Sequence, residues 1–121
     1  MNTIRSSLDK LRKLPEFPLE ENEKIIEHYT ASYDMGNSQF SSWRLGNLYL
    51  TNKRVFFAQG RKIIFNIPMS QIKDINIVER RWILGKKIEQ LRISWGDTKT
   101  KFVYIGIKNP AYWKDLIEAE A

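Results

Sequence analysis

Few side chains in this 121-residue sequence have the types and spacing that catalysis requires. His28 is the single histidine and lies in an apolar segment, and the chain contains no cysteine. Half of the carboxylates fall in residues 16–23 and in the last residues, where we expect solvated positions. No glycine-rich phosphate-binding loop occurs. The sequence therefore predicts a non-enzymatic protein that holds no metal and no cofactor.

Basic side chains offer a different kind of chemistry, which is the binding of anions. Twenty Lys and Arg residues exceed 14 Asp and Glu residues, which gives a net charge of +6 at pH 7. Such a surplus favours acidic membrane surfaces, nucleic acid or acidic proteins as partners. The plain alternative is that the charge serves solubility.

One basic cluster surrounds the sequence RRWILGKK, residues 80–87. An apolar tip between two basic pairs is typical of a hairpin that dips into a membrane or docks on a partner. In the alternative, the apolar residues extend two strands and the cations protect a sheet edge against aggregation. Both interpretations stay open, and the candidate hairpin residues are Arg80, Arg81, Trp82, Lys86 and Lys87.

Aromatic residues in a basic chain can form a stacking platform for nucleic acid. Tyr49, Phe56, Phe57 and Phe65, however, lie within continuous apolar runs, so we expect most of them in the core. No motif of a nucleic-acid-binding fold is present. Nucleic acid is therefore an unlikely partner.

Short runs rich in β-branched and aromatic residues, separated by turn residues, predict a mainly β protein. Seven strands are expected, at residues 24–33, 45–51, 54–59, 62–67, 72–79, 88–95 and 101–107. Short turns make the sheet antiparallel, and a sheet of this length must curl or close. We expect a helix at 111–121 with Asn109 as its N-cap and an apolar stripe that covers the curled sheet. Residues 1–16 have the spacing of a short amphipathic helix, or form a tail.

Three segments resemble the GRAM domain, a member of the pleckstrin-homology-like (PH-like) superfold. They read FPLEENEKIIEHYTASY from Phe17, GNLYLTNKRVFF from Gly46 and IPMSQIKDI from Ile67. The resemblance implies that residues 17–121 form one domain, a seven-stranded bent antiparallel barrel closed by the C-terminal helix. It also implies that Gly46 marks the start of the second strand and that Trp113 plugs the barrel.

The superfold further implies a lipid-binding end made of the loops after strands 1, 3 and 6. We expect basic contacts to phosphates there, with aromatic side chains entering the headgroup region. The candidate residues are Arg44, Arg61, Lys62, Lys99 and Lys101, with Phe40 and Trp43 as aromatic wedges. The basic cluster of phosphoinositide-specific relatives is reduced to Lys24 and Arg44 here, and Asp34 is nearby. This departure favours a loose contact with anionic lipid over a headgroup-specific phosphoinositide pocket.

The alternative function is a protein-interaction or self-association scaffold, such as a homodimer that associates through an exposed strand edge or through the RRWILGKK hairpin. No apolar run is long enough to span a membrane and no signal peptide is evident. We therefore expect a cytoplasmic protein, attached peripherally to a membrane if the lipid interpretation holds.

Overall fold

The computed structural model describes residues 17–34, 44–81 and 87–121. The prediction for residues 1–16 lies outside these ranges, as do Phe40, Trp43, Trp82 and Lys86. The elements are β1 (Ile25–Asp34), β2 (Arg44–Thr51), β3 (Arg54–Gln59), β4 (Lys62–Pro68), the 3₁₀ turn η1 (Met69–Gln71), β5 (Ile72–Arg81), β6 (Lys87–Trp95), β7 (Lys101–Gly106) and α2 (Pro110–Glu120). Every expected strand and the C-terminal helix are present, with small shifts at their ends.

The helix begins differently from the prediction. Asn109 lies at the N-cap position, but its backbone is left-handed with a φ of 57°, and its side chain makes no capping hydrogen bond. The carbonyl of Asn109 instead accepts a hydrogen bond from the amide of Trp113 at 3.3 Å. Pro110 occupies the first turn, where its missing N–H costs nothing.

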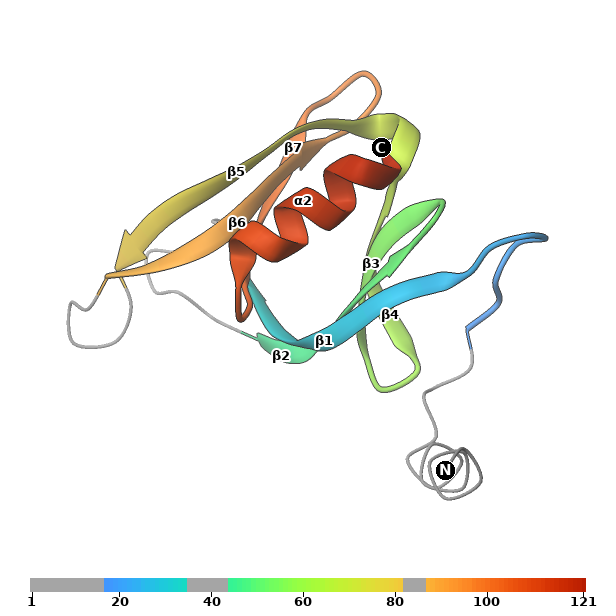
Figure 1. The fold of residues 1–121 in the computed structure, drawn as a ribbon, viewed down its shortest axis with the longest axis horizontal. Coiled ribbons are helices and arrows are strands. Elements are labelled where there is room, and N and C mark those ends of the chain that lie inside the picture. The colour runs from blue at the N-terminus through green and yellow to red at the C-terminus, as the bar shows by residue number, and fades with distance from the viewer. Residues whose placement is uncertain (1–16, 35–43, 82–86) are drawn as a thin grey trace.

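The strands form one antiparallel sheet in the order β4-β3-β2-β1-β7-β6-β5. The predicted closed barrel is wrong, because no pairing among the described strands joins β4 to β5. Pro68 ends β4 and has no N–H to donate, and η1 then separates the two strands. The result is a strongly bent sheet with two free edges, and α2 lies across its opening (Figure 1).

The concave face of the sheet carries the main core. On β2 and β3, Leu48, Leu50 and Val55 point into it, and α2 adds Trp113, with 2% of its surface exposed, and Ile117. The expectation that Trp113 plugs the fold is therefore confirmed. Gly46 lies near the start of β2, as expected, and a Cβ there would come within 2.5 Å of the carbonyl oxygen of Ala58. A side chain at this position would force the β2–β3 ladder apart.

A second, smaller apolar cluster lies on the opposite face of the sheet. Tyr49, Phe56 and Ala58 are buried there, and Phe17 packs against both rings with centroid distances of 5.2 and 5.0 Å. His28 stacks on Tyr49 at 5.6 Å, which identifies it as a packing residue. The segment before β1 therefore covers part of the outer face of the sheet.

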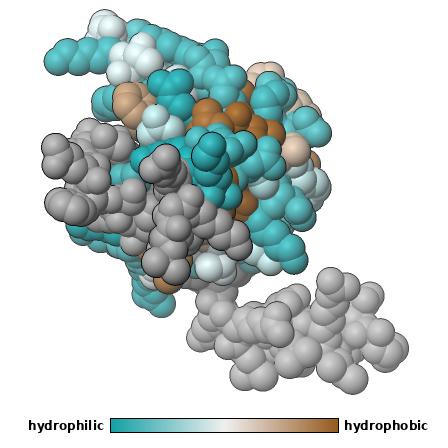
Figure 2. All heavy atoms as spheres, turned by 90° about the vertical axis from the view of Figure 1, so that its left-hand side faces the viewer, coloured by the Kyte–Doolittle hydropathy of each residue, from teal (hydrophilic) through white to brown (hydrophobic). Residues whose placement is uncertain are grey.

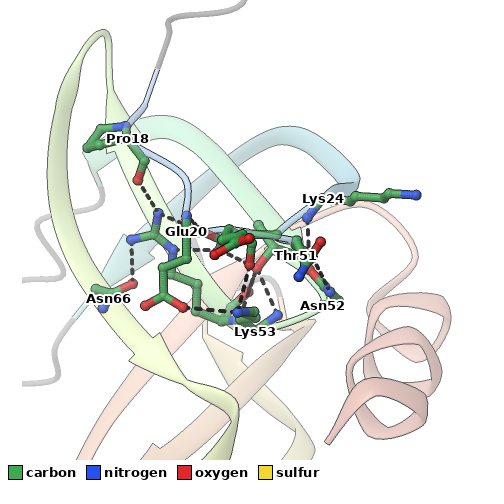
Figure 3. Close-up of polar contacts among 11 residues, drawn as sticks. Pro18, Glu20, Lys24, Thr51, Asn52, Lys53 and Asn66 are labelled. Atoms are coloured by element: carbon green, nitrogen blue, oxygen red, sulfur yellow. Dashed lines mark hydrogen bonds and ion pairs between the residues drawn. The ribbon is translucent and has the colours of Figure 1, made fainter.

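A polar network fixes this segment against the β2–β3 turn (Figure 3). The carboxylate of Glu23 is fully buried; it accepts hydrogen bonds from the Thr51 hydroxyl at 2.7 Å and the Arg54 guanidinium at 2.8 Å. Arg54 also donates to the carbonyl of Pro18, and the Asn52 side chain accepts from the amide of Lys24. A buried carboxylate with these partners is stabilised as the charged form.

Burial acts to raise the pKa of Glu23. Hydrogen bonds from the Glu20 amide, the Thr51 hydroxyl and Arg54, together with the charge of Arg54, outweigh burial and place the pKa below its ordinary value. A carboxylate whose pKa is lower in the folded state than in the unfolded state stabilises the fold at pH values above its unfolded-state pKa. That contribution is lost as the pH falls through the folded pKa.

We expect Trp113→Ala to destabilise the fold by about 3–5 kcal/mol, because it removes the largest buried side chain and leaves a cavity. Urea unfolding followed by circular dichroism measures the loss. Tyr112→Ala is the matched control, since Tyr112 is adjacent but 49% exposed. Equal losses for the two variants would show that α2 does not seal the core through the Trp113 indole.

Glu23→Gln should lower the free energy of unfolding at neutral pH, because it removes a buried carboxylate paired with Arg54. The gap between wild type and variant should shrink as the pH falls below the ordinary glutamate value of 4.5. Denaturation series at several pH values measure this gap, with the exposed Glu21→Gln as control. A gap that stays constant down to acidic pH would contradict the assigned charge state.

Candidate functional site

The described candidate cations fall into two groups. Arg44 begins β2, Arg61 lies in the β3–β4 turn, and Lys62 begins β4. The register of β2 and β3 brings these segments together, and the Gln59 side chain donates to the carbonyl of Leu45 at 2.9 Å across the gap. We call Arg44, Arg61 and Lys62 the basic edge.

Lys99 and Lys101 lie apart from the basic edge. Their β6–β7 turn is linked to η1, because the Gly96 amide donates to the carbonyl of Gln71 at 3.1 Å. This contact lies beyond the Pro68 end of β4, whereas Lys62 begins that strand. Figure 1 shows the β6–β7 turn at the upper side of the molecule and the β3–β4 turn at its lower side. The bend of the sheet therefore separates turns that the resemblance to the superfold assigns to one end.

A pocket of about 340 Å³ lies beside the β6–β7 turn. Lys99 and Lys101 line it with Trp95 and Gln71, but Asp97 is also part of the lining. None of the residues of the basic edge lines this pocket. The pocket thus offers two cations and one carboxylate, which is a weak arrangement for a highly charged headgroup.

The cations of the basic edge are exposed and lie outside the described ion pairs, a property that they share with Lys24, Lys73, Lys99, Lys101 and Lys108. Arg44, Arg61 and Lys62 are all exposed. Within the described ranges, the ion pairs use a different set of cations: Lys53, Arg54, Arg80, Lys87 and Lys114. The charge of the basic edge is therefore not neutralised by neighbouring carboxylates in the part of the chain that the structure describes.

The alternative hairpin is only partly described. Arg80 pairs with the buried Asp34 at 3.1 Å and lies 3.9 Å above the Tyr104 ring, so its guanidinium is engaged within the fold. Lys87 lies 4.0 Å from Glu79, with both side chains exposed. Arg81 is described by its backbone pairing with Lys87 alone. The ion pair with Asp34 and the contact with the Tyr104 ring favour a structural role for Arg80.

An exposed leucine beside the basic edge was missed by the sequence analysis, which treated it as part of an apolar strand. Leu45 is 72% exposed. Leu48 and Leu50 face the core, so the two-residue period of a strand places Leu45 on the other face. This alternation of side chains along the strand was the sequence signal that could have predicted the exposure of Leu45.

Leu45 also lines a groove of about 510 Å³ where β1 and β6 diverge beyond the end of β7. Tyr29, Ile88 and Ile107 supply further apolar lining, and Lys108 is the single cation of the groove. Figure 2, which views the left-hand side of Figure 1, shows hydrophobic residues at the surface among hydrophilic ones. The groove is chemically unlike a phosphate site.

No helix in the described ranges has the length and hydrophobicity of a membrane span. The same ranges contain no group of three or more His, Cys, Asp or Glu side chains that could hold a metal ion.

Solved structures of PH-like domains share this fold. The Vps36 N-terminal PH domain superposes with a TM-score of 0.62 at 16% sequence identity, covering 85% of this chain and 82% of that one. The hSac2 domain from the human phosphoinositide phosphatase Sac2 superposes with a TM-score of 0.54 at 16% identity, covering 98% and 75%. Identities this low establish the fold alone.

Sequence comparison identifies the family more directly. No curated protein sequence matches the chain. The family model of the GRAM domain matches residues 10–119, which is nearly the whole sequence and includes the three segments quoted above. The chain belongs to the GRAM domain family.

Proposed function

We propose that this domain attaches reversibly to anionic membrane surfaces through the basic edge, with Leu45 as an apolar contact. The GRAM family and the PH-like fold are typical of non-catalytic modules associated with membranes or lipids. The observation that carries the proposal is the grouping of three exposed cations, all outside the described ion pairs, beside the exposed side chain of Leu45. Arg44, Arg61 and Lys62 are exposed outside the described ion pairs, while the cations at the β2–β3 turn are bound to Glu20 and Glu23.

The chemistry of the contact would be electrostatic attraction supplemented by shallow burial. Each Lys or Arg near an anionic membrane contributes roughly 1 kcal/mol. Three such residues give weak binding that salt screens, since the Debye length falls from about 10 Å at 0.1 M to about 3 Å at 1 M. Leu45 would add apolar burial at the interface.

A phosphoinositide-specific pocket is the narrower form of this proposal. The two groups of cations are separated by the bend of the sheet, and the pocket beside Lys99 and Lys101 includes Asp97. This arrangement favours recognition of surface charge over recognition of one headgroup. Phe40 and Trp43 remain candidate wedges from the sequence and lie outside the described residues.

The double variant Arg61→Glu/Lys62→Glu should weaken binding to phosphatidylserine-containing vesicles by about tenfold or more, because two attractive contacts become repulsive. Vesicle sedimentation at several salt concentrations measures the change. The control Lys24→Glu/Lys73→Glu alters the net charge equally at exposed cations away from the basic edge and should have a smaller effect.

A third variant, Lys99→Glu/Lys101→Glu, tests the second group of cations separately. Equal losses for all three double variants would contradict a localised contact and indicate a response to net charge alone. A wild-type protein that ignores anionic vesicles at low salt would overturn the proposal. Strong binding to a small fraction of one phosphoinositide, with indifference to phosphatidylserine, would replace it with the narrower form.

A further inference from the structure

Strand β1 has a free edge over much of its length, although it lies in the middle of the strand order. It pairs with β2 from Ile25 to Tyr33, but on its other side it pairs with β7 only at residues 32–34. Strand β7 ends at Gly106, and the chain then leaves the sheet towards α2. Among the described residues, no strand therefore lies beside residues 25–31 of β1 on the β7 side.

The backbone of Thr30 points its hydrogen-bonding groups into this opening. The amide of His28 donates to the side-chain carboxylate of Glu27 at 3.0 Å, which indicates that it points away from β2. Residues two apart on a strand point their backbone groups the same way, so the N–H and C=O of Thr30 face the place that β7 has left. The ladder with β7 begins only at Ser32, and none of the backbone hydrogen bonds of the described turns and loops involves Thr30. Such an edge is a template for an added strand.

The groove of about 510 Å³ described above runs along this edge. Residues 29–32 of β1 form one wall. Ile88 and Glu89 of β6 form the other wall, and their strand pairs with β7 only from Leu91 onwards. Beyond the end of β7, β1 and β6 run in different directions (Figure 1). Four residues of extended chain measure about 13 Å at 3.3 Å per residue, so the wall of β1 matches a short extended segment.

The chemistry of the walls fits a polypeptide better than a lipid or a nucleic acid. Glu89 and Lys108, the two charged residues of the described lining, are both exposed and opposite in sign. Leu45 and Tyr29 add exposed apolar surface. A phosphate would thus meet one cation beside a carboxylate, and an acyl chain would cover the backbone of Thr30 without giving it hydrogen-bond partners. An extended peptide complements both features, because its neutral backbone pairs with the edge and its side chains cover the apolar residues.

We propose that the edge of β1 at residues 28–31 binds an extended segment of a partner protein, which adds a strand antiparallel to β1 in the line of β7. The segment alternates apolar and polar side chains. Its apolar side chains lie over Leu45 and Ile88, which share the outer face of the sheet because Leu48 and Leu91 face the core. This contact needs no lipid and goes beyond the proposed membrane attachment.

Selection from a phage-displayed library of random heptapeptides tests the proposal without lipid. The immobilised protein should enrich peptides that alternate apolar and polar residues. A synthetic peptide of the enriched sequence should bind in solution by calorimetry and slow the hydrogen exchange of the Thr30 amide, measured by NMR. A library that yields no enriched sequence, or a peptide that binds without protecting Thr30, would overturn the proposal.

The variant Ile88→Lys tests the groove separately from the membrane contact, which uses Leu45. It should weaken binding of the synthetic peptide by about tenfold or more, because a charge replaces an apolar contact. Leu19→Lys is the matched control, since Leu19 is 41% exposed and does not line the groove. Thermal unfolding checks that both variants fold. Equal effects of the two folded variants would contradict binding in the groove.

N-methylated peptides test the backbone pairing on the unaltered protein, whatever the stability of Ile88→Lys. Methyl groups on the alternate amides that face β1 should abolish binding, because they remove the donors of the added strand. Tolerance of methyl groups on both alternate sets of amides would overturn the proposal. So would protection of Thr30 that grows with protein concentration in the absence of peptide, which would assign the edge to a second copy, or protection that requires phosphatidylserine vesicles.

Discussion

The absence of pairing between β4 and β5 in the described sheet is the constraint on which the rest of the structure depends. A closed sheet buries its own inner face, whereas this bent sheet leaves an opening that water would otherwise enter. Helix α2 covers that opening, with Trp113 and Ile117 buried against the concave face. The same lack of closure leaves β4 and β5 as the two edge strands of the described sheet.

Charge is distributed unevenly around this framework. Where the segment before β1 meets the β2–β3 turn, cations and carboxylates neutralise each other, and Glu23 and Arg54 act as a buried tie. At the basic edge, described carboxylates do not pair with Arg44, Arg61 or Lys62. The net charge of +6 is therefore divided between cations that form ion pairs within the fold and exposed cations that lie outside the described ion pairs.

Local patterning was sufficient to predict the strands and the helix, because turn residues and two-residue periodicity are properties of short segments. Closure was not predictable in this way, since it depends on whether two consecutive strands pair with each other across the turn η1 that follows Pro68. The grouping of the cations at one end came from the family resemblance, and the structure places the β6–β7 turn of Lys99 and Lys101 beside η1, apart from the β3–β4 turn of Arg61. Two features could have been predicted from the sequence. The exposure of Leu45 follows from the alternation of side chains along its strand, and a structural role for Glu23 is suggested by its position just before a β-rich segment. The left-handed backbone conformation of Asn109 could not have been predicted from the sequence pattern.

The most direct test of this account is the removal of residues 108–121, which deletes α2 and leaves the sheet strands intact. If the open sheet depends on α2 to cover its apolar face, the shortened chain should lose cooperative unfolding and bind the hydrophobic dye ANS strongly. Near-ultraviolet circular dichroism should lose the signal of packed aromatic side chains at the same time. A shortened chain that unfolds cooperatively, excludes the dye and keeps its aromatic signal would contradict the account.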